Sequence, residues 1–315
     1  MGKAGVKKNV TSLHTLIHAL LLTMRGIILF YIYPTASFAQ TPCTPGAPKH
    51  FQRVLIIVLE NQNYEEVMKD SYFRSLAQRG ANFTNFHGLF HPSYSNYLAM
   101  VSGKEIRTHF DWQVDLTDHK TIADLLQSHG LRWKNYAEGY PDRRSMDPKK
   151  YPDFCFTESR YGRYARKHVP FVSFIPSHQR EKYCANIVPA GQFAEDLRNK
   201  ELPEYAFYTP DMDHNGHDTD LAHASRWLQG FLEPLLQDPD FMARTLIVVT
   251  FDESGRENKR KDNHIYTVFL GGMVKPGEYH ENYNHFNVLR TIEDNFCLDT
   301  LAEGDSRAQP IDVWK

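Results

Sequence analysis

The sequence predicts an α/β fold, a three-layer α/β/α sandwich in which helices cover both faces of a mostly parallel sheet. Two apolar runs rich in β-branched residues, RVLIIVLE at 53–60 and TLIVVTFDE at 245–253, are typical of strands buried on both faces. Weaker strand patterns occur at 204–211 and 265–272. Helical patterns alternate with these strands, and that alternation favours a parallel sheet.

Six segments have the residue spacing of helices. They are 64–79, 94–102, 120–129, 191–199, 218–236 and 285–296. No linker rich in Pro, Gly or Ser divides residues 45–315, so residues 40–315 are predicted to form a single domain. Residues 138–185 are rich in Tyr, Arg, Lys and Pro and have little periodicity. We expect an inserted loop region there, bordering the site.

The N-terminal segment reads as a signal peptide. Residues 1–39 contain no Asp or Glu and end in small residues that suit cleavage before Gln40. A start at Met24 would leave a compact signal with a short apolar core. A membrane anchor is the alternative, but Arg25 and Pro34 interrupt the apolar run of about 20 residues that a span needs. The sequence therefore predicts an exported protein, periplasmic or secreted, with no stable membrane anchor.

Charge limits the choice of partner. The formal net charge is −2, and removal of residues 1–39 takes away four basic groups and leaves −6. A protein of this charge is not expected to bind nucleic acid through bulk electrostatics.

The four cysteines suggest two disulfides, because the count is even and the chain is predicted to be exported. Three pairings are possible, and we favour Cys155–Cys184 with Cys43–Cys297. A cysteine zinc site is the weaker alternative, since the chain has no C-x-x-C pair.

Acidic residues follow the two most apolar strands. Glu60 and Asn61 come after the first, and Asp252 and Glu253 end the second. Ligands of open parallel sheets bind beyond the carboxyl ends of the strands. Adjacent buried carboxylates are costly unless they bind a cation, and oxygen ligands suit a divalent one. The alternative is that these acids lie on solvated loops or cap helices.

The stretch HPSYSNYLAMVSG at 91–103 predicts a short helix that Gly103 ends. Its serines are explained most simply as helix caps. A helix N-terminus also attracts phosphate, and a metal ion there would activate a serine hydroxyl. Ser93 is then the candidate nucleophile, and Asn96 could donate a hydrogen bond to a phosphoryl oxygen.

Histidines in polar loops are candidate general acids, since imidazole protonates leaving groups near neutral pH. They are His214, His217, His264 and His285. For any one of them a surface or structural role is the alternative. His217 and His264 are the better placed of the four, because His217 directly precedes a predicted helix that follows a strand and His264 directly precedes a predicted strand.

Six motifs occur in an order that resembles the phosphoesterase family. They are VLENQNY, HPSYSNYLAMVSG, NGHD, TFDE, NHIYTVFLGGMVKPG and YNHFNVLRTIEDNF. The family contains bacterial and fungal acid phosphatases and is related to bacterial phospholipases C within the alkaline phosphatase superfamily. The resemblance runs from about residue 53 to the C-terminus and implies an alkaline-phosphatase-like fold.

The resemblance implies a role for each matching position. One divalent metal ion (Mg, Ca, Mn or Zn) is expected, because the additional histidines of two-metal relatives have no clear match. Its implied ligands are Glu60, Asn61, Ser93, Asp252 and Glu253. Ser93 matches the nucleophile, Asn96 the phosphate-contacting residue, and His217 and His264 match histidines of the phosphate pocket. His285 matches a histidine without an assigned role. Ser95 replaces the usual Pro and adds a second hydroxyl near Ser93.

These observations predict an exported, metal-dependent phosphomonoesterase that acts on a small phosphorylated substrate through a phosphoserine, with an acidic to neutral pH optimum. A phospholipase C-type phosphodiesterase is the first alternative. Aromatic residues of the inserted region could form the apolar rim that it needs: Tyr140, Tyr151, Phe154, Phe156 and Tyr161. An exported domain that binds phosphate or glycan without catalysis is the alternative of another class.

Overall fold

The computed structural model describes residues 1–2, 43–108, 111–117, 119–255 and 262–315. The chain divides into two units, Met1–Pro42 and Cys43–Lys315, and the described helices and strands lie in the second. Residues 3–39 of the predicted signal peptide lie outside the described residues. None of the described helices is long and apolar enough to cross a membrane.

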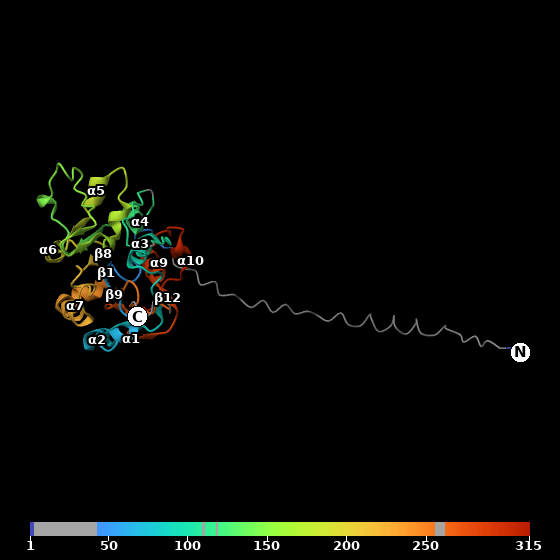
Figure 1. The fold of residues 1–315 in the computed structure, drawn as a ribbon. Helices are drawn as coiled ribbons and strands as arrows, with labels where there is room; N and C mark the ends of the chain where they lie inside the picture. Colours follow the sequence, from blue (N-terminus) through green and yellow to red (C-terminus); the bar gives the residue numbers. More distant parts are fainter. Residues whose placement is uncertain (3–42, 109–110, 118, 256–261) are drawn as a thin grey trace. The chain divides into compact units, whose positions relative to one another are not determined.

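An eight-stranded sheet forms the centre of the second unit (Figure 1), in the order β11–β2–β10–β9–β1–β8–β4–β7. β10 is antiparallel to β9 and β2, and the other neighbouring pairs of this sheet are parallel. The strands are β1 (Arg53–Leu59), β2 (Ala81–Phe83), β4 (Trp133–Ala137), β7 (Ile187–Pro189), β8 (Tyr205–Thr209), β9 (Thr245–Phe251), β10 (Thr267–Leu270) and β11 (Gly277–Tyr279). The predicted mostly parallel sheet is confirmed.

Helices cover both faces of this sheet (Figure 1). One layer contains α3 (Ser93–Ser102), α4 (Ile122–Ser128) and α9 (His285–Asn295). The other contains α2 (Ser71–Arg79), α6 (Gly191–Asn199), α7 (Leu221–Leu236) and α8 (Pro239–Arg244). The short α1 (Tyr64–Val67) and α10 (Gly304–Arg307) complete the α-helices of the main body, and β3 (Phe86–His87) pairs with β12 (Tyr283–Asn284).

The predicted helix over 64–79 is divided in two. Asp70 adopts an extended conformation, and its carboxylate accepts hydrogen bonds from the N–H groups of Tyr72 and Phe73. An Asp in this position caps a new helix, so α2 starts at Ser71 instead of continuing α1. In the layer that contains α3, Gly103 ends this helix in a left-handed conformation (φ 66°), as predicted.

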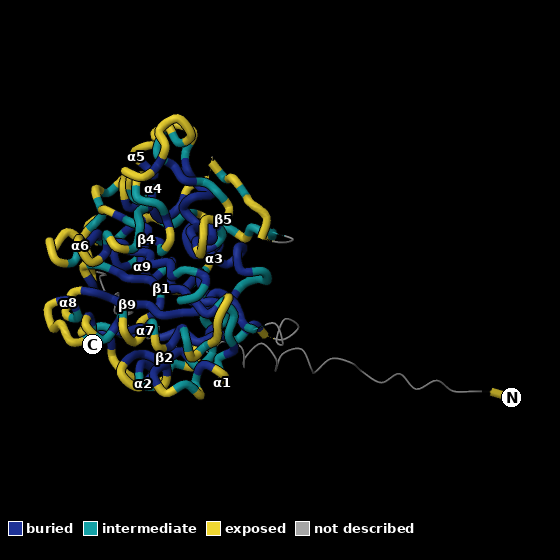
Figure 2. Tube along the Cα trace, turned by 60° about the vertical axis from the view of Figure 1, so that its left-hand side comes forward, coloured by how far each residue is buried: buried dark blue, intermediate teal, exposed yellow. Residues whose placement is uncertain are grey.

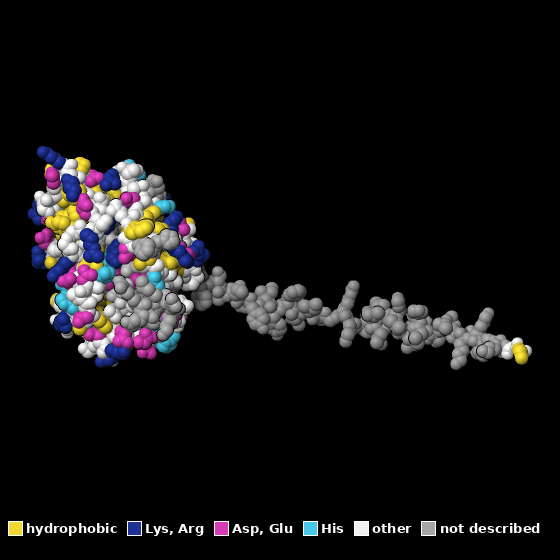
Figure 3. Space-filling view, in the orientation of Figure 1, with side chains coloured by type: hydrophobic (Ala, Val, Ile, Leu, Met, Phe, Trp, Pro, Cys, Tyr) yellow, Lys and Arg dark blue, Asp and Glu magenta, His cyan; other side chains and the backbone are white. Residues whose placement is uncertain are grey.

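The sheet is the most buried part of the fold, and its central strands are dark blue in Figure 2. Every residue from Val54 to Leu59 is buried, and so is all of β9. A strand with both faces covered needs apolar side chains at consecutive positions, which explains the continuous runs in the sequence. On the face seen in Figure 3, positive and negative side chains are interspersed.

The predicted inserted region has little regular structure. It contains β5 (Arg160–Tyr161), β6 (Tyr164–Ala165), α5 (Arg180–Cys184) and three 3-10 helices, Arg143–Ser145, Arg166–His168 and Pro170–Phe174. Its aromatic residues do not form the expected apolar rim. Tyr140 and Phe156 are buried against Tyr164, whereas Tyr161 is 59% exposed.

Both favoured disulfides are present, Cys43–Cys297 and Cys155–Cys184, with sequence separations of 254 and 29. The first joins the start of the second unit to the residues after α9. The second closes the inserted region. Each of these disulfides restricts the unfolded chain and thereby stabilises the fold, typically by about 2–4 kcal/mol.

A buried carboxyl group in α9 makes stability depend on pH. Glu293 is fully buried, and burial together with the charge of Asp305 raises its pKa from 4.5 to about 9, although Arg290 opposes the shift. The folded state therefore keeps this proton at neutral pH, whereas the unfolded state releases it. The contribution of this bound proton to the stability of the folded state is fully present below the pKa of the unfolded state. It is lost as the pH rises toward about 9.

Glu293→Gln keeps a neutral polar group at every pH, so we expect it to raise the free energy of unfolding by about 1–3 kcal/mol at about pH 8. The gain should vanish near pH 4, which denaturant titrations at the two pH values would measure. Asp294→Asn, on the same helix but paired with Lys49 at the surface, is the matched control. An equal effect of Glu293→Gln at both pH values would contradict the prediction.

Candidate active site

The carboxylates of Glu60, Asp252 and Glu253 lie together at one edge of the sheet. β1 and β9 are parallel neighbours in a register that pairs Leu59 with Phe251, so both strands deliver their next residues to the same place. All three acids are at most 2% exposed. Asn61 has a positive φ of 33°, and its backbone N–H donates a 3.2 Å hydrogen bond to Asp252 Oδ1.

The hydroxyl of Ser93 points into this group from the first residue of α3. Its Oγ is 3.0 Å from Glu60 Oε2, 3.2 Å from Asn61 Oδ1 and 3.3 Å from Glu253 Oε1. The Asn61 amide donates to Glu253 Oε1 at 2.7 Å. The structure thus brings together the five residues predicted to bind a metal. We call them the Ser93 site.

Electrostatics favour a cation in the Ser93 site. Burial, and then the charges of Glu60 and Glu253, raise the pKa of Asp252 well above its ordinary value. Asp252 Oδ2 is buried and has no hydrogen-bond partner among the residues that the structure describes. For Glu60, burial opposes ionisation, but His168 lowers its pKa and keeps the carboxylate charged. Three buried acids with an unpaired oxygen are the donor set that a divalent cation stabilises.

Ser95 and Asn96 point away from the Ser93 site. Ser95 Oγ lies 3.1 Å from Thr108 Oγ1 and accepts a hydrogen bond from the Thr108 N–H at 3.0 Å. Asn96 Oδ1 accepts from the N–H groups of Leu89 and Phe90, and its amide donates to the Phe90 carbonyl at 2.8 Å. Asn96 therefore holds the loop before α3, and its contact with phosphate remains a prediction.

The two candidate acid histidines have different surroundings. His217 Nε2 is 3.5 Å from Lys167 Nζ, and its Nδ1 is 2.7 Å from Asp218 Oδ1. His264 Nε2 is 3.0 Å from the Thr84 carbonyl, and its ring stacks on Tyr64. His217 lies near the Ser93 site, whereas His264 contacts β3, the loop before it and α1.

His285, whose role the sequence left open, supports the end of β9. It is buried, and its Nε2 donates to the Asp252 carbonyl oxygen at 2.8 Å. Burial lowers its pKa to about 4, so the imidazole is neutral at physiological pH. This contact fixes the backbone from which the Asp252 side chain projects.

The sequence did not identify three further residues near the Ser93 site as candidate site residues. His168 Nε2 is 3.0 Å from Glu60 Oε1, and Tyr97 stacks on its ring. His91 Nδ1 pairs with Glu253 Oε2. Lys167 precedes His168 in a 3-10 helix of the inserted region. His91 could have been found, because it is part of the HPS motif, but Lys167 and His168 lie where the sequence has no periodicity.

The loop after β8 connects these side chains. The Glu60 N–H donates to the Asn215 carbonyl at 2.9 Å, and the Asn215 amide lies 3.2 Å from His168 Nδ1. Asn215 Oδ1 also accepts from the His217 N–H at 2.8 Å. One asparagine therefore sets the positions of Glu60, His168 and His217 relative to one another.

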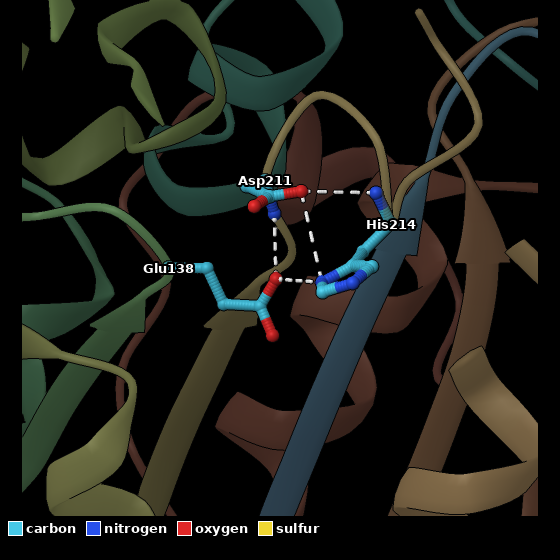
Figure 4. Close-up of side chains that lie close together, drawn as sticks. All are labelled: Glu138, Asp211 and His214. Atoms are coloured by element: carbon cyan, nitrogen blue, oxygen red, sulfur yellow. Dashed lines mark hydrogen bonds and ion pairs between the residues drawn. The ribbon is translucent and has the colours of Figure 1, made fainter. Parts of the chain in front are cut away.

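A second acidic group, outside the predicted metal ligands, could also hold a metal ion (Figure 4). It consists of Glu138, Asp211 and His214. Glu138 Oε2 is 2.6 Å from His214 Nδ1 and accepts from the Asp211 N–H at 3.0 Å. Tyr208 and backbone N–H groups already donate hydrogen bonds to these carboxylates. These hydrogen bonds hold the loop that carries Asn215.

A pocket of about 310 Å³ opens beside the Ser93 site. Most of its lining residues are polar or charged, and Tyr94, the residue after Ser93, is one of them. The lining residues are Tyr94, Asp111, Gln113, Ser159, Arg160, Ala165, Arg166, Lys167 and His217. A substrate bound here would place its anionic group next to a lysine and a histidine.

Comparison with known proteins gives the family. A family model described as the Phosphoesterase family matches residues 62–299, which is most of the chain. The chain belongs to the phosphoesterase family. This phosphoesterase is 34% identical to a probable acid phosphatase of Kluyveromyces lactis and 32% identical to an acid phosphatase of Aspergillus fumigatus, each over 84% of the chain. It spans only 62% and 59% of those two proteins.

A bacterial relative has a more similar length. The phosphoesterase is 30% identical to a phosphatidylinositol-3-phosphatase of Mycobacterium tuberculosis, with 87% of both chains covered. Each of these three relatives is named as a phosphatase.

Solved structures confirm the fold. A protein of the alkaline phosphatase superfamily from Vibrio parahaemolyticus has a TM-score of 0.56 at 13% identity, with 86% of this phosphoesterase and 72% of that chain covered. A phosphonate monoester hydrolase of Agrobacterium radiobacter has a TM-score of 0.50 at 13% identity, with 84% and 79% covered. The predicted alkaline-phosphatase-like fold is confirmed.

Proposed function

We propose that this phosphoesterase is an exported, metal-dependent phosphomonoesterase that forms a phosphoserine on Ser93. The observation that carries the proposal is the position of Ser93 Oγ, within 3.3 Å of oxygen atoms of Glu60, Asn61 and Glu253. The N-cap of α3 is Pro92 and not Ser93. Among the described residues, the hydrogen bonds of the Ser93 hydroxyl go to Glu60, Asn61 and Glu253, whereas a capping serine would direct its hydroxyl to backbone N–H groups.

The donor set fits a metal ion. Glu60, Asn61, Ser93, Asp252 and Glu253 would hold it, and the unpartnered Asp252 Oδ2 supports this assignment. Because all of these donors are oxygen atoms, Mg²⁺, Mn²⁺ or Ca²⁺ suits the site better than Zn²⁺. When bound, such an ion supplies charge neutralisation at the phosphoryl group and lowers the pKa of the serine hydroxyl.

The first step is attack of Ser93 Oγ on phosphorus, which forms an Oγ–P bond and breaks the ester P–O bond. The hydroxyl already donates to Glu60 Oε2, which marks the direction in which its proton leaves. His217 Nε2 gives a proton to the leaving oxygen, and Asp218 stabilises the imidazolium through Nδ1.

In the second step water attacks the phosphoserine, breaks the Oγ–P bond and releases inorganic phosphate. His217, now neutral, accepts the proton of this water, and Glu60 returns the proton of the first step to the departing Ser93 Oγ. Lys167 supplies fixed positive charge beside the reacting group: burial opposes its ionisation, but the charges of Glu60 and Asp111 raise its pKa above the ordinary value. We favour His217 over His264 as the acid because His217 lines the pocket.

The phosphodiesterase alternative is less favoured. The predicted apolar rim is largely buried, and the pocket beside Ser93 is lined by polar and basic groups. One candidate substrate is a phosphomonoester on a lipid headgroup, because one relative is named phosphatidylinositol-3-phosphatase. A binding protein without catalysis would have no need for a nucleophile among metal-binding acids. The two disulfides support export, which remains part of the proposal.

The test is a comparison of esters on the native protein with Mg²⁺ or Mn²⁺ supplied. We expect p-nitrophenyl phosphate and glycerol phosphate to be hydrolysed at least about 100-fold faster than bis(p-nitrophenyl) phosphate. His217→Asn should lower kcat/KM for glycerol phosphate by about 10²-fold or more and for p-nitrophenyl phosphate much less, because nitrophenolate needs no proton to leave.

His264→Asn separates the two candidate acids, since only the variant of the true acid should show this leaving-group dependence. Faster cleavage of the diester would favour the phosphodiesterase. Absence of turnover of every ester by the metal-supplied native protein would leave the binding protein as the remaining alternative.

A further inference from the structure

The carboxylate of Asp111 occupies a position that suits a phosphate group. Its Oδ1 accepts a 3.2 Å hydrogen bond from the backbone N–H of Tyr94, and its Oδ2 accepts a 2.9 Å bond from Lys167 Nζ. Tyr94 directly follows Ser93 in the first turn of α3, where N–H groups lack partners within the helix and attract anions. Two groups that would bind the phosphate of a substrate therefore hold a carboxylate of the protein itself.

The position of Lys167 shows that this place belongs to the reaction site. Lys167 Nζ is 3.5 Å from His217 Nε2, and its side chain is only 12% exposed. Asp111, Tyr94, Lys167 and His217 line the same pocket. A phosphoryl group on Ser93 would extend toward the Tyr94 N–H and Lys167, because these are the positively polarised groups next to the nucleophile.

Asp111 can give up its place at modest cost. Its side chain is 31% exposed, so the carboxylate can turn into water without being left buried and unpaired. Lys167, by contrast, is mostly buried and would lose its ion pair with Asp111. An incoming phosphate supplies another anion and takes over both hydrogen bonds.

We propose that Asp111 is an internal competitor for the phosphate-binding position: it occupies the Tyr94 N–H and Lys167 until the phosphate of a substrate displaces it. The proposal rests on the proposed function, in which the Ser93 site takes a phosphomonoester. Asp111 sets how strongly phosphate binds, because the observed affinity is the intrinsic one reduced by the fraction of molecules with the position free.

The competition also favours monoesters. A phosphomonoester or inorganic phosphate carries up to two negative charges near neutral pH, whereas a diester carries one. When a dianion replaces the singly charged carboxylate beside Lys167, the Coulomb attraction to Lys167 becomes stronger. When a monoanion replaces it, this attraction stays about the same. Asp111 thus raises the selectivity of the site for doubly charged phosphate.

Calorimetric titration with inorganic phosphate tests the proposal without any turnover. Asp111→Asn removes the competing charge and is expected to tighten phosphate binding by about 10-fold, and Asp111→Ala should act in the same direction. Lys167→Gln should weaken it by about 10-fold or more. Asp115→Asn is the matched control, since Asp115 lies in the same segment, pairs with Arg166 and does not line this pocket.

The sign of the Asp111 effect decides the outcome. Weaker phosphate binding in Asp111→Asn would show that Asp111 only positions Lys167, and unchanged binding in that variant or in Lys167→Gln would equally overturn the proposal. Loss of turnover with phosphate binding intact would count against the proposed function alone, because the titration does not depend on hydrolysis.

Discussion

Ser93→Ala is expected to lower kcat/KM for p-nitrophenyl phosphate by about 10⁴-fold or more while leaving the fold intact. The substitution removes the only atom that can form the covalent phosphoserine. The side chain is buried, but its hydroxyl bonds only to other polar groups of the site, so the loss creates little empty space. Steady-state kinetics with circular dichroism as a check on folding measure both parts of the prediction.

Ser95→Ala is the matched control for that experiment. The Ser95 hydroxyl bonds to Thr108 and not to the acids, so its loss should cost about 1 kcal/mol of stability and change kcat/KM only slightly. If Ser95→Ala abolished hydrolysis while Ser93→Ala kept most of it, the assignment of the nucleophile would be wrong.

Asp252→Asn is expected to have opposite effects on activity and on stability. It removes one charge from the metal-binding set, so kcat/KM should fall by about 10²–10³-fold even with excess Mg²⁺ or Mn²⁺. In the metal-free protein the same change removes a buried carboxyl group that is costly to ionise: burial, and then the charges of Glu60 and Glu253, raise the pKa of Asp252 well above its ordinary value. We therefore expect the metal-free variant to unfold at a higher temperature than the metal-free native protein.

Thermal unfolding with and without a chelator measures this pair of effects. The native protein should gain stability on addition of metal, and Asp252→Asn should gain much less. Glu138→Gln is the comparison, because it alters the second acidic group and replaces no residue of the Ser93 site. Loss of the metal-induced stabilisation in Glu138→Gln, but not in Asp252→Asn, would move the metal to the second group.

The central strands could be predicted from the sequence because they are buried on both faces. β1 and β9 are short, continuous apolar runs rich in β-branched residues, which is typical of such strands. β4 was missed because Lys134 and Asn135 interrupt its apolar pattern. Asn135 is nevertheless fully buried, and its amide bonds to the Phe207 carbonyl and to Thr209. A buried polar residue whose partners lie on a neighbouring strand leaves no signal in its own segment.

In the site, too, some residues could be predicted from the sequence and others could not. Glu60 and Asp252 follow strong strands, so their meeting at one sheet edge could be expected once β1 and β9 were placed side by side. Lys167 and His168 could not be placed in this way, because the chain that carries them is organised by a disulfide and by tertiary contacts. The direction of the Asn96 side chain also depends on the loop at 89–90, which no periodic pattern describes.

The most direct measurement of the central claim is the capture of the covalent intermediate. The metal-supplied protein would be mixed with p-nitrophenyl phosphate, quenched in acid within milliseconds to seconds, digested and examined by mass spectrometry with fragmentation. We predict the mass of one added phosphoryl group on the peptide that contains residues 91–103, located on Ser93 and absent from Ser93→Ala. A phosphoryl group on Ser95, or burst kinetics in Ser93→Ala equal to those of the native protein, would contradict the account.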